Sequence, residues 1–214
     1  GAVLPATAGA PEMRFEVDLP IAWNGKAVQY GGGGYNGNIP RVSSWATHGV
    51  RAEAPPLAKG WLTFGDDSGH QSRDGNDASF ALNDEATQNF AYMHIRKARD
   101  AAFAVAKRFY GREPQRLYFS GSSTGGREAL TAAARWPDLY DGVISYYPTA
   151  NFTGLRLWGA KLADVIYSDN SAGWIPPALV DKIGQEGLAA CDKLDGAADG
   201  IVANLGACRA GATA

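Results

Sequence analysis

The sequence has little charge of either sign, no long hydrophobic run and few cysteines. Its 214 residues carry 20 lysines and arginines against 22 aspartates and glutamates, a formal net charge of −2. Without a basic cluster the chain lacks the field that attracts polyanions, so nucleic acid is not an expected partner. The longest apolar stretches, such as residues 101–106, are far shorter than the roughly 18 residues that span a bilayer. No membrane-spanning segment is therefore expected.

The two termini lack further signals. Residues 1–10 show no basic region followed by an apolar run, which indicates a mature or trimmed chain rather than a signal peptide. Only two cysteines are present, Cys191 and Cys208, both near the C-terminus. An even pair suggests a disulfide, and two unrelated buried thiols are the alternative that the count leaves open.

What is present is an alternation of strand and helix patterns. β-rich runs are predicted at residues 14–20, 27–30, 61–64, 116–120 and 142–146, and helices at 84–110 and 128–135. This order favours an α/β fold with a mainly parallel sheet. After Pro148 the pattern changes to aromatics among short helical pieces. We therefore predict a core over residues 1–150 and an inserted lid segment over residues 151–214.

A serine between glycines follows directly after the predicted strand 116–120. The run Gly121-Ser122-Ser123-Thr124-Gly125 matches the pattern G-x-S-x-G, which places its middle serine on a tight turn between a strand and a helix. Small neighbours let the hydroxyl stand clear of the backbone. The pattern alone is weak in a glycine-rich chain, but the strand before it and the helix after it supply the required context. Ser123 is the predicted nucleophile, with a decorative Gly/Ser turn as the alternative.

A nucleophilic serine also needs amide donors for the negative charge that develops on the attacked carbonyl. The amide of Thr124 directly follows the nucleophile, and the glycine run 31–34 follows an early strand, where a second donor is expected. Gly33 is favoured as this donor, with Gly32 next. The alternative is a merely flexible turn.

The histidines are in unexpected places for a serine hydrolase. His48, His70 and His94 all precede Ser123. Hydrolases that carry their serine on a G-x-S-x-G turn between a strand and a helix have the chain order nucleophile, acid, histidine. We therefore expect the general base to lie outside this chain. His70 is expected to pin a loop by hydrogen bonds rather than to act as a base, His94 is interpreted as a helix residue beside the packed face, and His48 gives no signal.

Aspartates recur at short spacing near the C-terminus. Asp192, Asp195 and Asp199 are separated by turns at Gly196 and Gly200. Ca²⁺ prefers several oxygen ligands from a short flexible segment, although the spacing here is not that of an EF-hand. The loop is a candidate calcium site, with a solvated acidic turn as the alternative. A disulfide between the two cysteines would clamp this loop and stabilise the folded state by about 3 kcal/mol. It would also indicate an oxidising compartment.

Together these segments resemble the tannase and feruloyl esterase family of α/β-hydrolases. The matching stretches are FEVDLP at residues 15–20, WNGK at 23–26, GGGGYNG at 31–37, DSGH at 67–70, SFALN at 79–83, GSSTGGR at 121–127 and CDKLDGAADGI at 191–201. The resemblance implies the N-terminal part of an α/β-hydrolase core with the start of a lid domain. It also implies a structural calcium ion held by the carboxylates of Asp192, Asp195 and Asp199 and the carbonyls of Ala197 and Ile201, beside a lid disulfide between Cys191 and Cys208.

The chain departs from the family pattern in two respects. The family usually has a cysteine directly before the nucleophile, bonded to one beside the catalytic histidine, and here that position is Ser122. Family members also continue beyond the lid to supply the triad acid and histidine, so this chain resembles a form trimmed at both ends.

The resemblance implies a serine esterase that acts on small esters of hydroxycinnamic, gallic or similar aromatic acids, including polyphenol and plant polysaccharide-linked esters. Secretion or export to a periplasm is expected, and no nucleic-acid or membrane partner. The alternative is a catalytically silent, calcium-stabilised fragment or binding module that lacks the triad acid and histidine.

Overall fold

The chain forms two compact units, Gly1–Phe152 and Thr153–Ala214, which are described separately. The computed structural model describes residues 1–44 and 53–212. His48 lies outside the described residues.

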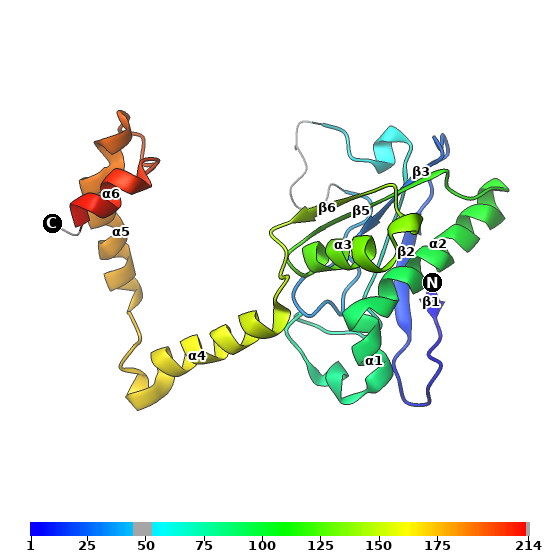
Figure 1. The fold of residues 1–214 in the computed structure, drawn as a ribbon, viewed down its shortest axis with the longest axis horizontal. Helices are drawn as coiled ribbons and strands as arrows, with labels where there is room; N and C mark the ends of the chain where they lie inside the picture. Colours follow the sequence, from blue (N-terminus) through cyan, green and yellow to red (C-terminus); the bar gives the residue numbers. More distant parts are fainter. Residues whose placement is uncertain (45–52, 213–214) are drawn as a thin grey trace. The chain divides into compact units, whose positions relative to one another are not determined.

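The first unit is built on one twisted sheet (Figure 1). Among the described residues six strands pair in the order β1-β2-β4-β3-β5-β6. Parallel pairing joins β3 to β4, β3 to β5 and β5 to β6, whereas β2 runs antiparallel to both β1 and β4. The α/β fold with a mainly parallel sheet is thereby confirmed. The strands are β1 (Ala2–Val3), β2 (Met13–Asp18), β3 (Lys26–Tyr30), β4 (Leu62–Asp66), β5 (Arg116–Ser122) and β6 (Gly142–Tyr146).

The helices of this unit follow β4 and β5 along the chain. The Asn83 side chain accepts a hydrogen bond from the backbone N–H of Ala86 and so caps the first helix, a position for which asparagine is among the preferred residues. Gly111 ends the long helix with φ 74°, a conformation that glycine adopts without strain. The helices are α1 (Asp84–Gln88), the π-helical turn η3 (Asn89–Met93), α2 (His94–Tyr110) and α3 (Thr124–Arg135), with 3₁₀ turns η1 (Leu57–Lys59), η2 (Ser79–Leu82) and η4 (Pro137–Leu139).

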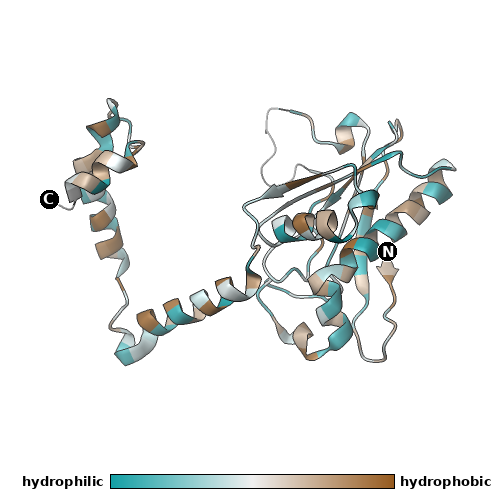
Figure 2. Cartoon of the chain, in the orientation of Figure 1, coloured by the Kyte–Doolittle hydropathy of each residue, from teal (hydrophilic) through white to brown (hydrophobic). Residues whose placement is uncertain are grey.

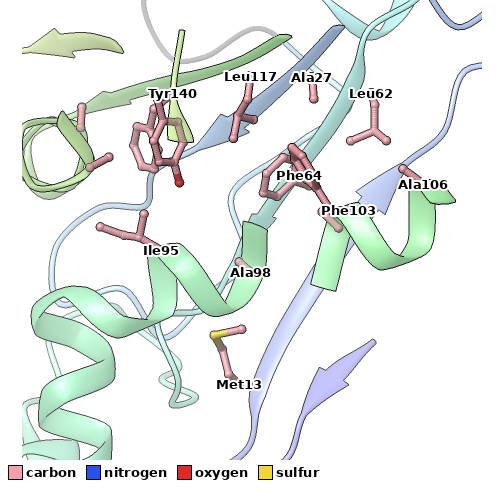
Figure 3. Packing of buried hydrophobic residues seen from close by; sticks show 14 residues of the cluster. Met13, Ala27, Leu62, Phe64, Ile95, Ala98, Phe103, Ala106, Leu117 and Tyr140 are labelled. Carbon is pink, nitrogen blue, oxygen red and sulfur yellow. The ribbon is translucent and has the colours of Figure 1, made fainter. Parts of the chain in front are cut away.

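The main core lies between one face of the sheet and helices α2 and α3 (Figure 3). Phe64 of β4 and Phe103 of α2 both belong to it, and burying a side chain of this size contributes about 1.5–3 kcal/mol. Residues alternate across the sheet, so Val28 and Tyr30 face the opposite side and pack in a smaller cluster with Val42. The core fixes the carboxyl ends of β3 and β5 next to the start of α3. Its members are Met13, Ala27, Leu62, Phe64, Ile95, Ala98, Ala102, Phe103, Ala106, Leu117, Phe119, Ala129, Ala132 and Tyr140.

The second unit is helical. Hydrophobic and hydrophilic residues are mixed along its helices (Figure 2), and Trp158 and Ile183 are more than half exposed. In the part of the chain that the structure describes, no helix is both long and apolar enough to cross a membrane. The elements are α4 (Phe152–Ser171), which is interrupted by non-helical backbone at residues 168–170, α5 (Pro177–Cys191), η5 (Asp192–Asp195) and α6 (Leu205–Ala212).

Candidate active site

Ser123 lies on a tight turn between β5 and α3. Its backbone has φ 56° and ψ −117°, a region that residues with a side chain rarely adopt and that costs of order 1–3 kcal/mol. The turn is held from both sides: the Ser123 N–H donates to the Tyr146 carbonyl at 3.1 Å, and the Ser123 carbonyl accepts from the N–H groups of Arg127 and Thr149, each at 3.1 Å. The strand–turn–helix geometry expected around this serine is present.

The glycines around the serine are required by close backbone contacts. A Cβ on Gly121 would lie 2.3 Å from the Gly125 carbonyl oxygen, and a Cβ on Gly126 would lie 2.6 Å from the Tyr146 carbonyl oxygen. Atoms cannot approach so closely, so larger residues would push α3 away from β5 and β6. The G-x-S-x-G-G run therefore reflects packing as well as exposure of the hydroxyl.

The glycine run at residues 31–34 packs against the first turn of α3. The Gly125 N–H donates to the Gly32 carbonyl at 2.9 Å, and the Thr124 hydroxyl donates to the Gly34 carbonyl at 2.6 Å. A Cβ on Gly31 would lie 2.6 Å from the Cα of Gly125. The structure thus brings the glycine run, Thr124 and Ser123 together, although the run and the serine lie far apart in the sequence.

The two candidate loop amides differ in their surroundings. The Gly32 N–H donates to Oε2 of Glu128 at 3.1 Å, so it is already engaged. Gly33 lines a cleft of about 500 Å³ together with Ser123, Asn36 and Tyr146, and within the described ranges its N–H has no hydrogen-bond acceptor. Thr124 is the first residue of α3, where a backbone N–H has no acceptor within the helix. Within the described ranges, the N–H groups of Gly33 and Thr124 are therefore the candidate amides without an acceptor, and their role as oxyanion donors stays a prediction.

A buried ionic chain lies behind the glycine run. His94 Nδ1 lies 2.8 Å from Oδ1 of Asp66, and His94 Nε2 lies 3.6 Å from Oε1 of Glu128. All three residues are no more than 4% exposed. Burial alone would lower the pKa of His94, but the two carboxylates outweigh it, so this pKa is raised above its ordinary value.

This ionic chain was missed at the sequence level. The sequence predicts His94 to be a helix residue beside the packed face, and no sequence pattern singles out Glu128. Asp66 lies 28 residues before His94, so no local spacing marks the pair. The one available signal is that His94 and Glu128 fall on the buried faces of their helices, where an unpaired charged residue would be costly.

His70 has a structural environment. Its ring stacks on Phe80 with centroids 4.0 Å apart, and its Nδ1 lies 3.5 Å from the Ser68 hydroxyl. Burial lowers the pKa of His70, and the residue is only 4% exposed. These contacts agree with a loop-pinning role rather than with that of a base for Ser123.

The aspartate loop of the second unit is closed by its own side chains. Asp192 Oδ1 accepts from the Gly200 N–H at 2.9 Å, and Asp195 Oδ2 accepts from the Ala203 N–H at 3.0 Å. Asp199 accepts from the Ile201 N–H at 3.0 Å. Over residues 1–44 and 53–212 no three acidic, histidine or cysteine side chains gather closely enough to hold a metal. The expected carboxylate ligands are thus not assembled here, and calcium binding stays a prediction.

The disulfide beside this loop is confirmed. Cys191 at the end of α5 is bonded to Cys208 in α6, with Cα atoms 5.2 Å apart. It spans the aspartate loop and joins the two helices on either side of it.

Several known proteins are similar to this chain in sequence and in fold. The model of the tannase and feruloyl esterase family matches residues 1–214. An uncharacterised esterase of Agrobacterium fabrum is 54% identical over 98% of this chain and 38% of its own length, and the mono(2-hydroxyethyl) terephthalate hydrolase of Piscinibacter sakaiensis is 33% identical over 93% and 35%. The crystal structure of feruloyl esterase B from Aspergillus oryzae superposes with a TM-score of 0.76 at 27% identity, over 95% of this chain and 38% of that one.

The three matches cover similar shares of the two chains that are compared. The chain spans little more than a third of the length of each of these relatives, while nearly all of its own residues are matched. The fold, with Ser123 on the strand–helix turn and the glycine run beside it, agrees with the family match over the whole sequence. The chain belongs to the tannase and feruloyl esterase family of α/β-hydrolases.

Proposed function

We propose that this chain supplies the nucleophile and the oxyanion-binding amides of a serine carboxylic-ester hydrolase. The observation that carries the proposal is the strained backbone of Ser123 on a turn packed against the glycine run, at a cleft that both line. A strained serine costs stability and persists where its position has a use. The alternative is a catalytically silent binding module. It gives no reason for the strained backbone of Ser123, or for a Gly33 N–H that has no hydrogen-bond acceptor within the described ranges.

In the proposed reaction the Ser123 hydroxyl oxygen attacks the ester carbonyl carbon while a general base takes its proton. The N–H groups of Thr124 and Gly33 hold the oxyanion, and the alcohol leaves with a proton returned by the base. Water, activated in the same way, then hydrolyses the acyl-enzyme and restores the serine. His70 and His94 are engaged in other contacts, so we propose that the base and its acid come from the remainder of the full-length protein.

The proposed substrates are esters of aromatic acids. Support comes from similarity to proteins named as a feruloyl esterase, a tannin acyl hydrolase and a mono(2-hydroxyethyl) terephthalate hydrolase. Hydroxycinnamic, gallic and similar acyl groups, free or linked to polyphenols or plant polysaccharides, fit this range. Residues 151–214 would act as a lid over the acyl part. The disulfide supports secretion or a periplasmic location, because such bonds persist in oxidising compartments.

Covalent labelling tests the nucleophile. The full-length protein should be phosphonylated at Ser123 by a fluorophosphonate, and Ser123→Ala should remove both labelling and hydrolysis of methyl ferulate. Ser122→Ala is the matched control, since it changes the neighbouring hydroxyl and should leave labelling intact. Labelling at another residue would contradict the proposal. The 214 residues alone should show little turnover, and robust turnover by them would refute the external base.

We also propose that the loop around Asp192, Asp195 and Asp199, with the carbonyls of Ala197 and Ile201, binds a structural calcium ion. Ligand binding to the folded state raises stability, so chelation should lower the melting temperature and added Ca²⁺ should restore it. Asp195→Asn should abolish this response, whereas Asp181→Asn on the neighbouring helix α5 should keep it. An unchanged melting temperature after chelation would mean that the loop is only an acidic turn.

A further inference from the structure

Glu128 is a fully buried carboxylate whose side chain reaches the glycine run. We propose that Glu128 is a positioning residue for the oxyanion site: supported by His94 and Asp66, it fixes Gly32 and Asn36 so that Gly33 stays in the wall of the cleft beside Ser123. The inference rests on the proposed esterase function and extends it to a residue outside the reacting groups.

The contacts of Glu128 are divided between its two oxygens. Oε2 accepts from the Gly32 N–H at 3.1 Å, and Oε1 accepts from Nδ2 of Asn36 at 2.6 Å. A Cβ on Gly32 would lie 2.8 Å from the Asn36 side chain. One carboxylate therefore holds both ends of the turn from Gly32 to Asn36, and the amide of Gly33 lies within that turn.

The same helix carries the nucleophile and this carboxylate. Ser123 precedes the first residue of α3, and Glu128 lies just over one turn into it. The bonds from Thr124 and Gly125 to the glycine run come from that first turn as well. The loop is thus located relative to the serine by a single rigid element, which is the arrangement that holds reacting groups in place.

The negative charge of Glu128 is stabilised by the other two members of the buried ionic chain, His94 and Asp66. A buried carboxylate without a partner is strongly unfavourable, and His94 Nε2 lies 3.6 Å from Oε1 while His94 Nδ1 is held by Asp66 at 2.8 Å. Hydrogen bonds to a charged acceptor are about twice as strong as neutral ones. A charged Glu128 therefore holds the Gly32 amide more firmly than a neutral side chain would.

Another buried hydrogen bond in the same core shows what the loss of a purely structural contact would do, and so serves as the control for Glu128. The Tyr140 hydroxyl donates to Oε1 of Gln29 at 2.7 Å, and Nε2 of Gln29 donates to the Ile95 carbonyl. Within the described residues neither side chain has a hydrogen bond to residues 31–34. Tyr140→Phe removes the bond to Gln29 without changing the shape of the ring. If Glu128 only stabilised the fold, the two sites would behave alike.

The experiment uses the full-length protein and its Glu128→Gln, Tyr140→Phe and double Glu128→Gln/Asn36→Asp variants. Reactive sites are counted by fluorophosphonate titration, and kcat and KM for methyl ferulate are expressed per titrated site beside each melting temperature. Glu128→Gln should lower kcat roughly 10- to 100-fold, the size expected for a misplaced oxyanion donor, with KM changed less than about threefold. Tyr140→Phe should lower the melting temperature and keep kcat.

The double variant supplies the rescue. The NH₂ group introduced by Glu128→Gln faces Nδ2 of Asn36 unless the Asn36 amide turns over to offer Oδ1, a buried atom without a hydrogen-bond partner within the described residues. Asn36→Asp supplies an acceptor without that turn and moves the charge across the pair. It should recover about tenfold or more of the lost kcat. Unchanged kcat per site in Glu128→Gln, or no recovery in the double variant, would overturn the positioning role.

Two further outcomes are distinguishable. If Glu128→Gln does not fold, Asn36→Ser removes one of the two bonds to the carboxylate and should still lower kcat several-fold per titrated site, and an unchanged value overturns the inference. If the unaltered protein is neither labelled at Ser123 nor active on the ester, the proposed function itself fails, and the positioning role fails with it.

Discussion

Ser123 combines a side chain with a backbone conformation that normally belongs to glycine. Its φ of 56° and ψ of −117° are maintained by hydrogen bonds to Tyr146, Arg127 and Thr149. The three partners come from the end of β6, from α3 and from the segment after β6, so the strain is balanced by several elements at once. The strained backbone lowers the stability of the fold, and it fixes the position of the Ser123 hydroxyl.

Removing the hydroxyl in two ways separates strain from chemistry. Ser123→Gly and Ser123→Ala both abolish the nucleophile, but only glycine relieves the positive φ. After allowance for the greater freedom of glycine in the unfolded chain, Ser123→Gly should be more stable than Ser123→Ala by about 1 kcal/mol. Urea denaturation of the two variants measures the difference. Equal stability, or a more stable alanine variant, would show that the turn is not strained.

The sequence predicts some residues of the site better than others. Ser123 and Thr124 are recognisable because their neighbours along the chain define the turn. The sequence left Gly32 and Gly33 as alternatives, because the difference between them is a hydrogen bond from Gly32 to Glu128, 96 residues later. The sequence indicates only a helix residue at His94 for the same reason, because its partners Asp66 and Glu128 are distant in the chain. Local pattern identifies backbone turns, and long-range polar pairs need the fold.

The elements themselves follow the hydrophobic pattern closely. The strand predicted at 142–146 matches β6, and the helix predicted over 84–110 is present with the π-helical turn η3 inside it. That turn was not foreseen, because the hydrophobic pattern does not mark an inserted residue. Phe109 continues the helical spacing of the apolar residues Ile95, Ala98, Ala102 and Val105, which predicts burial, yet it is 63% exposed in the last turn of α2. Helix α3 begins at Thr124 rather than at 128, since packing against the glycine run offsets the poor helix propensity of two glycines.

Helix α3 offers a test of that packing. Glycine to alanine in a helix normally stabilises by roughly 0.5–1 kcal/mol, and Gly184→Ala in α5, where nothing lies within 4 Å of the added Cβ, should do so. At Gly125 the Cβ would lie 2.7 Å from the Gly32 carbonyl oxygen, so Gly125→Ala should destabilise by about 2 kcal/mol, as overpacking does. Thermal melts of both variants measure this. A stabilised Gly125→Ala variant would mean that the glycine run is not tightly seated.

At the scale of the whole chain, the two units are stabilised in different ways. Residues 1–152 have a buried core between sheet and helices, whereas over residues 153–211, whose side chains the structure describes, the one buried apolar side chain is Cys191. The change of pattern after Pro148 predicted a boundary near this position. A unit with so little core depends on cross-links and on the closure of its loop by Asp192 and Asp195.

The disulfide should therefore stabilise one unit and leave the other unchanged. Closing a loop with a sequence separation of 17 residues stabilises by about 3 kcal/mol on the chain-entropy model. The paired substitution Cys191→Ser/Cys208→Ser should speed hydrogen exchange in peptides from α5 and α6, while peptides from β5 and α3 keep their protection, because the core of the first unit contains neither cysteine. Exchange followed by mass spectrometry reads both units in one sample. An equal rise in β5 would show that the two units unfold together, and no rise in α5 would show that the bond is not what holds the aspartate loop and its helices.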